Sequence, residues 1–200
     1  MSYTRAESVQ IDAWKDLGNR EWSWDALMPF YIKSENLTKP SAFDLKAGAS
    51  YNESFHGFEG PLHVSFNQFH DGNLTTPLNK TFDKLGLPWS EDVNGGKMRG
   101  FSVFPETIDH EKNVREDAAR AYYWPYRERP NLILMRNTRA NRLVWKDDKE
   151  IDGDDAVADG VEVHTSGGTS TVKARREVIL SAGSLRTPTI LEYSGVGNKV

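Results

Sequence analysis

The stretch VILSAGSLRTPTILEYSGVG, residues 178–197, decides the fold. It begins with an apolar run, which is typical of a parallel strand that is covered on both faces. The run ends at Ala182-Gly183-Ser184, and Thr187-Pro188 then opens a helix, because proline fits a first helical turn. Ligands of doubly wound sheets bind where strands end, and glycine lets a backbone approach them closely. The stretch therefore predicts a strand, a turn and a helix. From the turn alone, packing is the preferred explanation of the small residues, and a ligand at the turn is the alternative.

The composition argues against several kinds of partner and of metal site. The net charge of −4 and the pI near 5.8 provide no basic excess for a nucleic-acid partner, so none is expected. No apolar run is long enough to cross a bilayer, so no membrane partner is expected either. The absence of cysteine excludes disulfides and thiolate metal sites.

The N-terminal region gives two conflicting signals about the compartment. Charged residues interrupt residues 1–30 throughout, which argues against a signal peptide. Four Asn-x-Ser/Thr sequons favour a secreted parent protein instead; they start at Asn36, Asn52, Asn73 and Asn79. This conflict predicts that the chain is an internal part of a longer protein, and it leaves the localisation open.

Helical periodicity dominates the first part of the chain and strand periodicity the last. The patterns predict helices over residues 9–17, 22–32, 76–86 and 113–126, and a final helix from Thr187. They predict strands over residues 62–66, 132–135, 138–145, 156–164, 170–174 and 177–182. The acidic run at residues 146–155 is interpreted as a solvated hairpin tip and not as a calcium loop, because it lacks the loop's spaced glycine and final glutamate.

No histidine is predicted to be catalytic or to bind a metal. Three histidines, His56, His63 and His70, recur at seven-residue intervals in a loop-rich region, without the close spacing of a metal site. Loop histidines of this kind are expected to be exposed. The tryptophans at positions 14, 22 and 24 allow a sugar-stacking surface, but core packing is the preferred interpretation.

The turn also carries a family resemblance. The pattern GS-x-x-TP-x-IL-x-x-SGVG at residues 183–197 resembles the second signature of the glucose–methanol–choline (GMC) flavin oxidoreductases. Tyr3, Ala6 and Asp12 fit the end of the family's first signature in register. Stretches between the two are similar to the glucose-oxidase-like and aryl-alcohol-oxidase-like branches: TRAESVQIDAW, WSWD, GFSVFPETI, REDAARAYYWPYRERPNL and EVILSAGS.

The resemblance implies an α/β fold, seen as α+β in this chain. It would comprise part of an FAD-binding doubly wound domain with an antiparallel β-meander, and a helical and loop segment of the substrate domain. Residues 1–35 would form the FAD-domain entry segment and helices, and residues 36–110 the loop-rich part of the substrate or cap region. Residues 111–200 would return to the FAD-binding domain with the meander and the second signature.

The same resemblance implies FAD as the cofactor and an alcohol or sugar as the substrate. Ser2 corresponds to the residue beside the flavin, and Ala140 to one that meets the adenine through its backbone. Ala182, Gly183 and Ser184 would line the phosphate end of the cofactor. The family's Gly-x-Gly-x-x-Gly fingerprint is absent from the chain, and its catalytic histidine is expected beyond Val200.

Two functions therefore stay open. The chain is either part of an enzyme that transfers hydride from a CH–OH group to FAD, or a non-catalytic protein or interaction module without flavin. A carbohydrate-binding module is a third and weaker alternative. The 200-residue chain alone is predicted not to oxidise alcohols, and residues 177–182 are predicted to leave apolar surface exposed.

Overall fold

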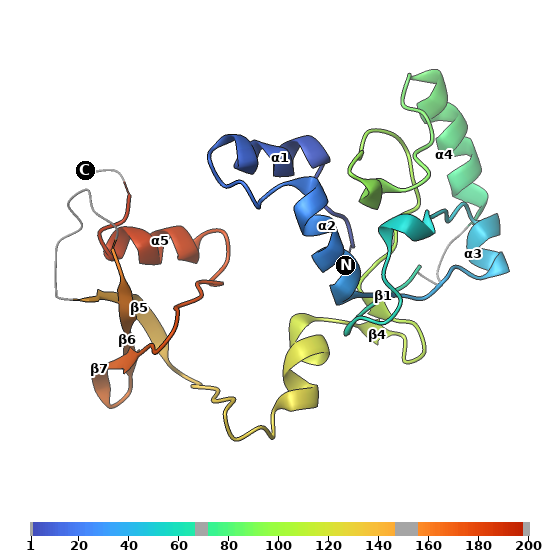
Figure 1. The fold of residues 1–200 in the computed structure, drawn as a ribbon. Coiled ribbons are helices and arrows are strands. Elements are labelled where there is room, and N and C mark those ends of the chain that lie inside the picture. Colours follow the sequence, from blue (N-terminus) through green and yellow to red (C-terminus); the bar gives the residue numbers. More distant parts are fainter. Residues whose placement is uncertain (1, 67–71, 147–155, 198–200) are drawn as a thin grey trace. The chain divides into compact units, whose positions relative to one another are not determined.

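The computed structural model describes residues 2–66, 72–146 and 156–197 (Figure 1). The chain forms two compact units, Met1–Leu132 (unit 1) and Ile133–Val200 (unit 2), each with its own buried residues. Both units combine helices with strands, as the α+β expectation requires. The predicted hairpin tip at residues 147–155 and the predicted site of His70 lie outside the described residues.

Unit 1 begins with two helices, α1 (Ser8–Asp16) and α2 (Trp24–Ser34). Both were predicted, and Ser23 caps α2 by accepting a hydrogen bond from the Ala26 N–H. Neither helix contains a buried residue. The expectation that Trp14 and Trp22 pack in a core is wrong: both are more than half exposed and contact each other at a ring-centroid distance of 6.3 Å.

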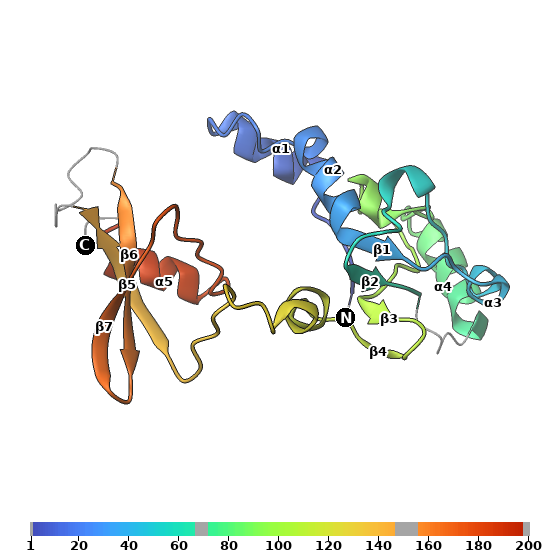
Figure 2. The ribbon, with the colours of Figure 1, turned by 60° about the horizontal axis from the view of Figure 1, so that its bottom comes forward.

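The core of unit 1 lies around two short parallel strands, β1 (Glu35–Leu37) and β2 (Leu62–Val64), which run side by side in Figure 2. The predicted strand at 62–66 is thus confirmed, and it extends through a bridge between Ser65 and Glu106. The core consists of four residues, Leu37, Ala49, Val64 and Phe66. Each is at most 5% exposed, so a small cluster anchors a loop-rich unit.

Shorter elements surround this core. The helices α3 (Ala42–Lys46) and α4 (Gly72–Lys84) follow β1 and β2, and two single 3-10 turns are η1 (Glu53–Phe55) and η2 (Val93–Gly95). The predicted helix at 76–86 is α4, which starts earlier than expected and ends at Lys84, two residues before Gly86, where φ is +78°. On its inner face Phe82 stacks on Phe101 at 5.2 Å.

The predicted helix over residues 113–126 is wrong in its first part and confirmed in its second. Its first part is a strand, β4 (Val114–Arg115), which pairs with β3 (Ile108–Asp109) across a turn at Asn113. Asp117 then accepts a hydrogen bond from the Arg120 N–H at 2.9 Å, which is how aspartate starts a helix. Only the wide turn η3 (Ala119–Tyr123) and the 3-10 turn η4 (Trp124–Tyr126) are helical.

Unit 2 is an antiparallel meander with one helix. The strands β5 (Arg139–Trp145), β6 (Ala158–Thr165) and β7 (Gly168–Lys173) pair in chain order, as predicted, and α5 (Arg186–Tyr193) lies along β5 (Figure 2). Ser194 connects the end of α5 to β5 through two hydrogen bonds. Its hydroxyl accepts from the Leu143 N–H at 2.8 Å, and its carbonyl accepts from the Trp145 indole at 2.7 Å.

Two predicted strands of unit 2 do not form. Residues 132–135 and 177–182 have no strand partner within the parts of the chain that the structure describes. The reason is that apolar composition marks a strand, whereas pairing needs a second strand beside it. Ile133 is 81% exposed and Ile179 is 75% exposed. The prediction of exposed apolar surface at residues 177–182 is therefore confirmed, although without the strand.

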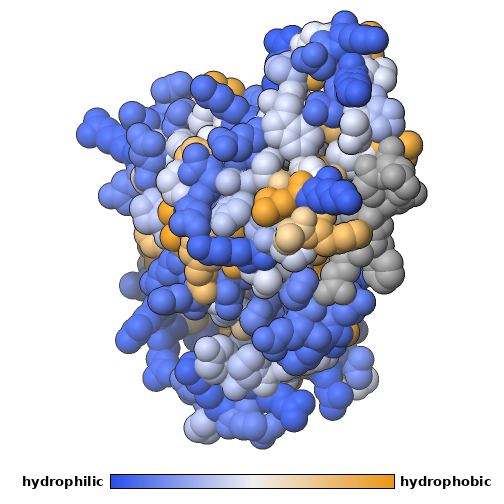
Figure 3. Space-filling model, turned by 90° about the vertical axis from the view of Figure 1, so that its right-hand side faces the viewer, coloured by the Kyte–Doolittle hydropathy of each residue, from blue (hydrophilic) through white to orange (hydrophobic). Residues whose placement is uncertain are grey.

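Hydrophobic side chains also reach the surface in unit 1, including Val9, Leu17, Phe30 and Leu85. Figure 3 shows one face of the molecule, on which small hydrophobic patches interrupt a mostly hydrophilic surface. Leu85, the first residue after α4, is 69% exposed.

Candidate functional site

The turn at residues 182–184 is a closed loop that Thr187 holds from both sides. The Ala182 N–H donates to the Thr187 hydroxyl at 3.0 Å, and the Thr187 N–H donates to the Gly183 carbonyl at 3.0 Å. Gly183 has a φ of +92°, which non-glycine residues rarely adopt. The signature threonine and glycine therefore shape this turn directly.

The backbone of the turn is open to an incoming group. A Cβ atom added to Gly183 would have no heavy atom within 4 Å, and the side chains of Ala182 and Ser184 are exposed. The turn leads into α5, whose first turn has the Thr187 N–H bonded to the Gly183 carbonyl and contains Pro188, which has no N–H. An exposed serine hydroxyl and an uncovered glycine backbone suit an anionic group such as a phosphate. The three predicted residues thus fit the phosphate end of a dinucleotide.

Ala140 lies on β5 and pairs with Val163 of β6. The pairing register shifts between Ala140 and Arg142, so the strand is irregular beside it. A small cavity of about 60 Å³ opens there. Its lining comes from β5 and α5: Arg139, Ala140, Asn141, Arg186, Thr189, Ile190 and Tyr193. The structure thus brings Ala140 close to the helix that follows the glycine turn.

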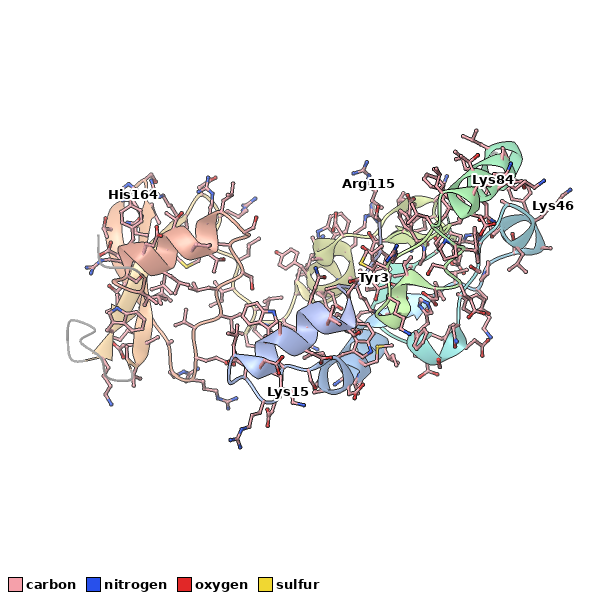
Figure 4. The ribbon with its side chains drawn as sticks, turned by 90° about the horizontal axis from the view of Figure 1, so that it is seen from above. Tyr3, Lys15, Lys46, Lys84, Arg115 and His164 are labelled. Atoms are coloured by element: carbon pink, nitrogen blue, oxygen red, sulfur yellow. The ribbon has the colours of Figure 1, made fainter. Side chains whose placement is uncertain are left out.

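Ser2 belongs to unit 1. It is exposed and forms an antiparallel bridge with Glu106, and the next residue, Tyr3, donates its N–H to the Pro105 carbonyl at 2.9 Å. Figure 4 shows Tyr3 among the helices and strands of this unit, whereas Lys46 and Lys84 point outward from α3 and α4. The segment around Ser2 is therefore a paired strand edge and not a frayed end.

A buried cluster of charged side chains lies behind this segment, and sequence reasoning missed it. Arg5 donates to Glu35 at 2.8 Å, and the other oxygen of Glu35 lies 2.8 Å from Nδ1 of His56. The Nε2 atom of His56 lies 2.8 Å from a carboxylate oxygen of Asp92. We call these four side chains the charge cluster. All are nearly or completely buried, so the expectation of an exposed loop histidine is wrong for His56.

Backbone groups complete the charge cluster. Glu35 also accepts from the Gly57 N–H at 3.1 Å, and Asp92 accepts from the N–H groups of Asn52 and Asn94 at 2.9 and 2.8 Å. The Arg5 guanidinium lies between the rings of Tyr3 and Tyr31 and donates to the Phe55 carbonyl. Carboxylates that accept several bonds in this way tolerate burial.

The charge cluster shifts the pKa values of His56 and Asp92. Burial alone would lower the pKa of His56, but its bonds to Asp92 and Glu35 outweigh this effect and raise the pKa to about 9. For Asp92, burial acts to raise the pKa, yet the His56 ring and two backbone N–H groups hold it below its usual range. His56 is therefore an imidazolium at neutral pH.

The described part of the chain offers little other chemistry. Within it, no group of three His, Asp or Glu side chains is arranged to hold a metal ion. Asp109 is buried, and Lys112 pairs with it at 2.6 Å. Among the helices so described, none is long and apolar enough for a transmembrane span.

Known sequences match the chain over nearly its full length. The family description "GMC oxidoreductase" fits residues 1–200. A glucose oxidase-like protein, fsoC, from Humicola fuscoatra is 42% identical over 189 residues, which is 94% of this chain and 32% of that protein. Glucose oxidase 1 from Penicillium expansum is 36% identical over 207 residues, 99% of this chain and 33% of that protein.

Solved structures of oxidoreductases are also similar to this chain. An FAD-dependent oxidoreductase from Chaetomium thermophilum superposes with a TM-score of 0.83 at 31% identity, over 98% of this chain and 33% of that one. A fungal aryl-alcohol oxidase gives a TM-score of 0.78 at 26% identity, over 98% and 33% of the two chains. The chain spans about a third of the length of these relatives. It belongs to the GMC oxidoreductase family, in its glucose-oxidase-like branch.

Proposed function

We propose that this chain supplies part of the FAD site of an oxidoreductase that oxidises a CH–OH group of an alcohol or sugar. The observation that carries the proposal is the glycine turn of the family signature, whose backbone is open on the side where a Cβ atom would lie. The relatives named above include a glucose oxidase, an aryl-alcohol oxidase and an FAD-dependent oxidoreductase, which supports this substrate class and this cofactor.

The turn and the strand beside α5 have separate tasks in this proposal. Gly183 and Ser184 bind the pyrophosphate through backbone N–H groups and the serine hydroxyl, and the N-terminus of α5 adds its dipole. Ala140 meets the adenine through its main chain, next to the small cavity between β5 and α5. Ser2, on the paired edge of unit 1, meets the flavin.

When bound, FAD supplies the hydride acceptor for the oxidation. The residues of this chain bind and orient the cofactor. A general base must reach the substrate hydroxyl, and His56 is unsuited to that task because both of its ring nitrogens already face carboxylates. The base is therefore expected outside the described residues. Consistent with that, purified chain consisting of these 200 residues alone is expected to give no flavin-dependent turnover.

Two glycine variants test the cofactor site. Gly183→Val adds a side chain in the space that the pyrophosphate would use, at a positive φ. Gly168→Val is a matched control, because Gly168 has a φ of +111° and equally open surroundings but lies in the β6–β7 turn. The two substitutions impose a similar backbone strain on unit 2.

The measurement is the equilibrium affinity of the full-length apoprotein for FAD, followed by quenching of flavin fluorescence. Gly183→Val is expected to weaken binding at least about 30-fold, whereas Gly168→Val leaves it within about threefold, on the scale of about 1.4 kcal/mol per tenfold. Equal losses in both variants, or no FAD binding by the unmodified protein, would contradict the proposal.

A further inference from the structure

The charge cluster of unit 1 requires one protonation state. His56 places Nδ1 and Nε2 at 2.8 Å from carboxylate oxygens of Glu35 and Asp92. A neutral imidazole has one N–H donor and one acceptor, so it would press a lone pair against one of these oxygens. When His56 is an imidazolium, its positive charge and that of Arg5 balance the two negative charges of the buried carboxylates. A neutral ring would leave one buried negative charge without a positive partner.

A closed ring of hydrogen bonds and ion pairs, which we call the circuit, connects the charge cluster to the segment that carries Ser2. Asn94 accepts from the Arg5 N–H at 3.0 Å and donates its amide to the Tyr3 carbonyl at 3.4 Å, so it clamps the backbone on both sides of Thr4. The N–H of Asn94 is in turn held by Asp92, the partner of His56. From Arg5 the circuit runs through Glu35, His56 and Asp92 to Asn94 and back.

We propose that His56, as an imidazolium, is a positioning residue that holds segment 2–5 in place through this circuit. The role of the segment at the flavin rests on the proposed function above, whereas its anchoring by His56 does not. His56 does not touch the segment; it fixes the two carboxylates that fix Arg5 and Asn94. Loss of the ring's second N–H therefore loosens the chain at Tyr3 and Arg5.

The ring itself cannot move aside easily. Gly57, the next residue, packs so closely on the end of α2 that an added Cβ would lie 1.8 Å from the Ile32 carbonyl oxygen. The Gly57 N–H donates to Glu35, and its carbonyl accepts from the Leu37 N–H at 2.8 Å. The backbone that carries His56 is thus pinned between α2 and β1.

The charged groups around the ring come from every neighbouring element. Glu35 faces it from β1, Asp92 from the residue before η2, and Arg5 stands behind Glu35. The ring of Tyr51 also meets the His56 ring edge-on, at a centroid distance of 6.2 Å. Protonation of His56 is therefore governed by these two carboxylates.

The test compares His56→Gln with His164→Gln in the full-length protein. Glutamine can donate to one carboxylate but presents an oxygen to the other, so the circuit opens. His164 is exposed on β6, where it bonds the Thr169 hydroxyl, and it serves as the matched control. The readout is hydrogen exchange at the amides of Tyr3 and Arg5, which are bonded to the Pro105 carbonyl and the Asn94 side chain.

Exchange at Tyr3 and Arg5 is expected to accelerate at least about 100-fold in His56→Gln and to stay unchanged in His164→Gln. Amides of β5 and β6 should exchange alike in both variants. If His56→Gln fails to fold, the ring is observed directly by ¹⁵N NMR of the unmodified protein, with both nitrogens expected to be protonated at pH 7. A neutral ring at pH 7, or unchanged exchange at Tyr3 and Arg5, overturns the inference.

FAD affinity separates this inference from the proposed function. Weaker FAD binding by His56→Gln, together with faster exchange, supports both. Faster exchange in a protein that binds no FAD in any form supports the anchoring and contradicts only the proposed function. A protein that binds FAD through Gly183 but keeps slow exchange in His56→Gln contradicts only the anchoring.

Discussion

Units 1 and 2 are held together by different kinds of interaction. Unit 1 buries four charged side chains that bind one another, next to an apolar cluster of four residues. Unit 2 buries apolar residues from its sheet and helix, Leu143, Val163 and Ile190, and leaves long apolar side chains such as Ile133 and Ile179 exposed. One unit depends on matched charge, and the other on a small hydrophobic core.

The difference teaches what each unit needs to be stable. Four loops and a strand meet in unit 1, and buried polar partners are specific about which loop lies where, because each unmatched group is costly. A meander with a helix needs no such specification, since its ladder already sets the register. The two units should therefore respond to opposite perturbations: unit 1 to charge, unit 2 to apolar volume.

Removing the charge of Glu35 should have the largest effect. Glu35→Gln keeps the shape of the side chain but leaves Arg5 and His56 without the carboxylate between them, in a site with no exposure. Breaking a buried pair from one side costs about 3–5 kcal/mol. We expect that loss in the opening free energy of unit 1, measured by hydrogen exchange at the Leu37 amide, which bonds the Gly57 carbonyl.

The control is Glu59→Gln, on the exposed loop of the same unit. It should cost less than about 0.5 kcal/mol. A loss of similar size in both variants would show that unit 1 responds to its overall charge and not to the charge cluster.

Raising the pH should weaken unit 1 by a similar or smaller amount. Because the pKa of His56 is raised from 6.5 to about 9 in the folded state, its contribution is fully present below pH 6.5 and lost as the pH rises through 9. At about 1.4 kcal/mol per pKa unit the loss is on the order of 3 kcal/mol. Urea unfolding between pH 6 and 10, followed by tryptophan fluorescence, measures it, since five of the six tryptophans lie in unit 1.

In His56→Gln this decline above pH 6.5 should disappear. On the acid side Asp92 acts in the opposite sense. Its lowered pKa contributes stability above its usual value of 3.8, and that contribution is lost as the pH falls through the folded value. Unit 1 should therefore be most stable between these two limits. An unchanged alkaline decline in His56→Gln would assign the pH dependence to another group.

Removing apolar volume should affect unit 2 instead. Leu143 is 5% exposed on β5, and Leu143→Ala is expected to cost about 2–3 kcal/mol through lost burial and a cavity. Hydrogen exchange at the β5 and β6 amides measures this loss, while the Leu37 amide of unit 1 should not change. Val172→Ala, at a position 43% exposed on β7, is the control, with a cost below about 1 kcal/mol.

The smallest effect is expected at the exposed apolar run. Ile179→Thr changes a side chain that is 75% exposed, so the free energy of unfolding should shift by less than about 0.5 kcal/mol. Thermal unfolding of the full-length protein measures it. A large loss would mean that Ile179 is covered there by residues other than those described, and unit 2 would then have a larger core than its three buried apolar residues.

Local patterns in the sequence predicted the parts of the fold that local physics determines. Alternating residues predicted the meander, and Thr187-Pro188 predicted α5. The local patterns gave wrong predictions where a residue far away in the sequence determines the secondary structure. Val114 pairs with Asp109 instead of continuing a helix, and residues 177–182 find no strand beside them in the part of the chain described.

One part of the candidate site could likewise be predicted from local sequence, and another part could not. The turn at Gly183 was recognisable because signature residues close in sequence build it. The charge cluster was not, because Glu35, His56 and Asp92 are far apart in sequence and no spacing relates them. The sequence shows only that His56 directly precedes a glycine; the tight packing of Gly57, which limits the freedom of His56, is seen in the structure. The roles of Ser2, Ala140, Ala182, Gly183 and Ser184 at a cofactor stay predictions.

The bond between the Trp145 indole and the Ser194 carbonyl gives unit 2 an optical reporter of its own. Trp145 is the only tryptophan in residues 133–200, and its indole is tied to the residue that ends α5. With the other five tryptophans replaced by phenylalanine, its emission would follow the helix leaving the sheet in real time. Stopped-flow mixing with a dinucleotide would then show whether α5 is already seated before a ligand arrives at its first turn.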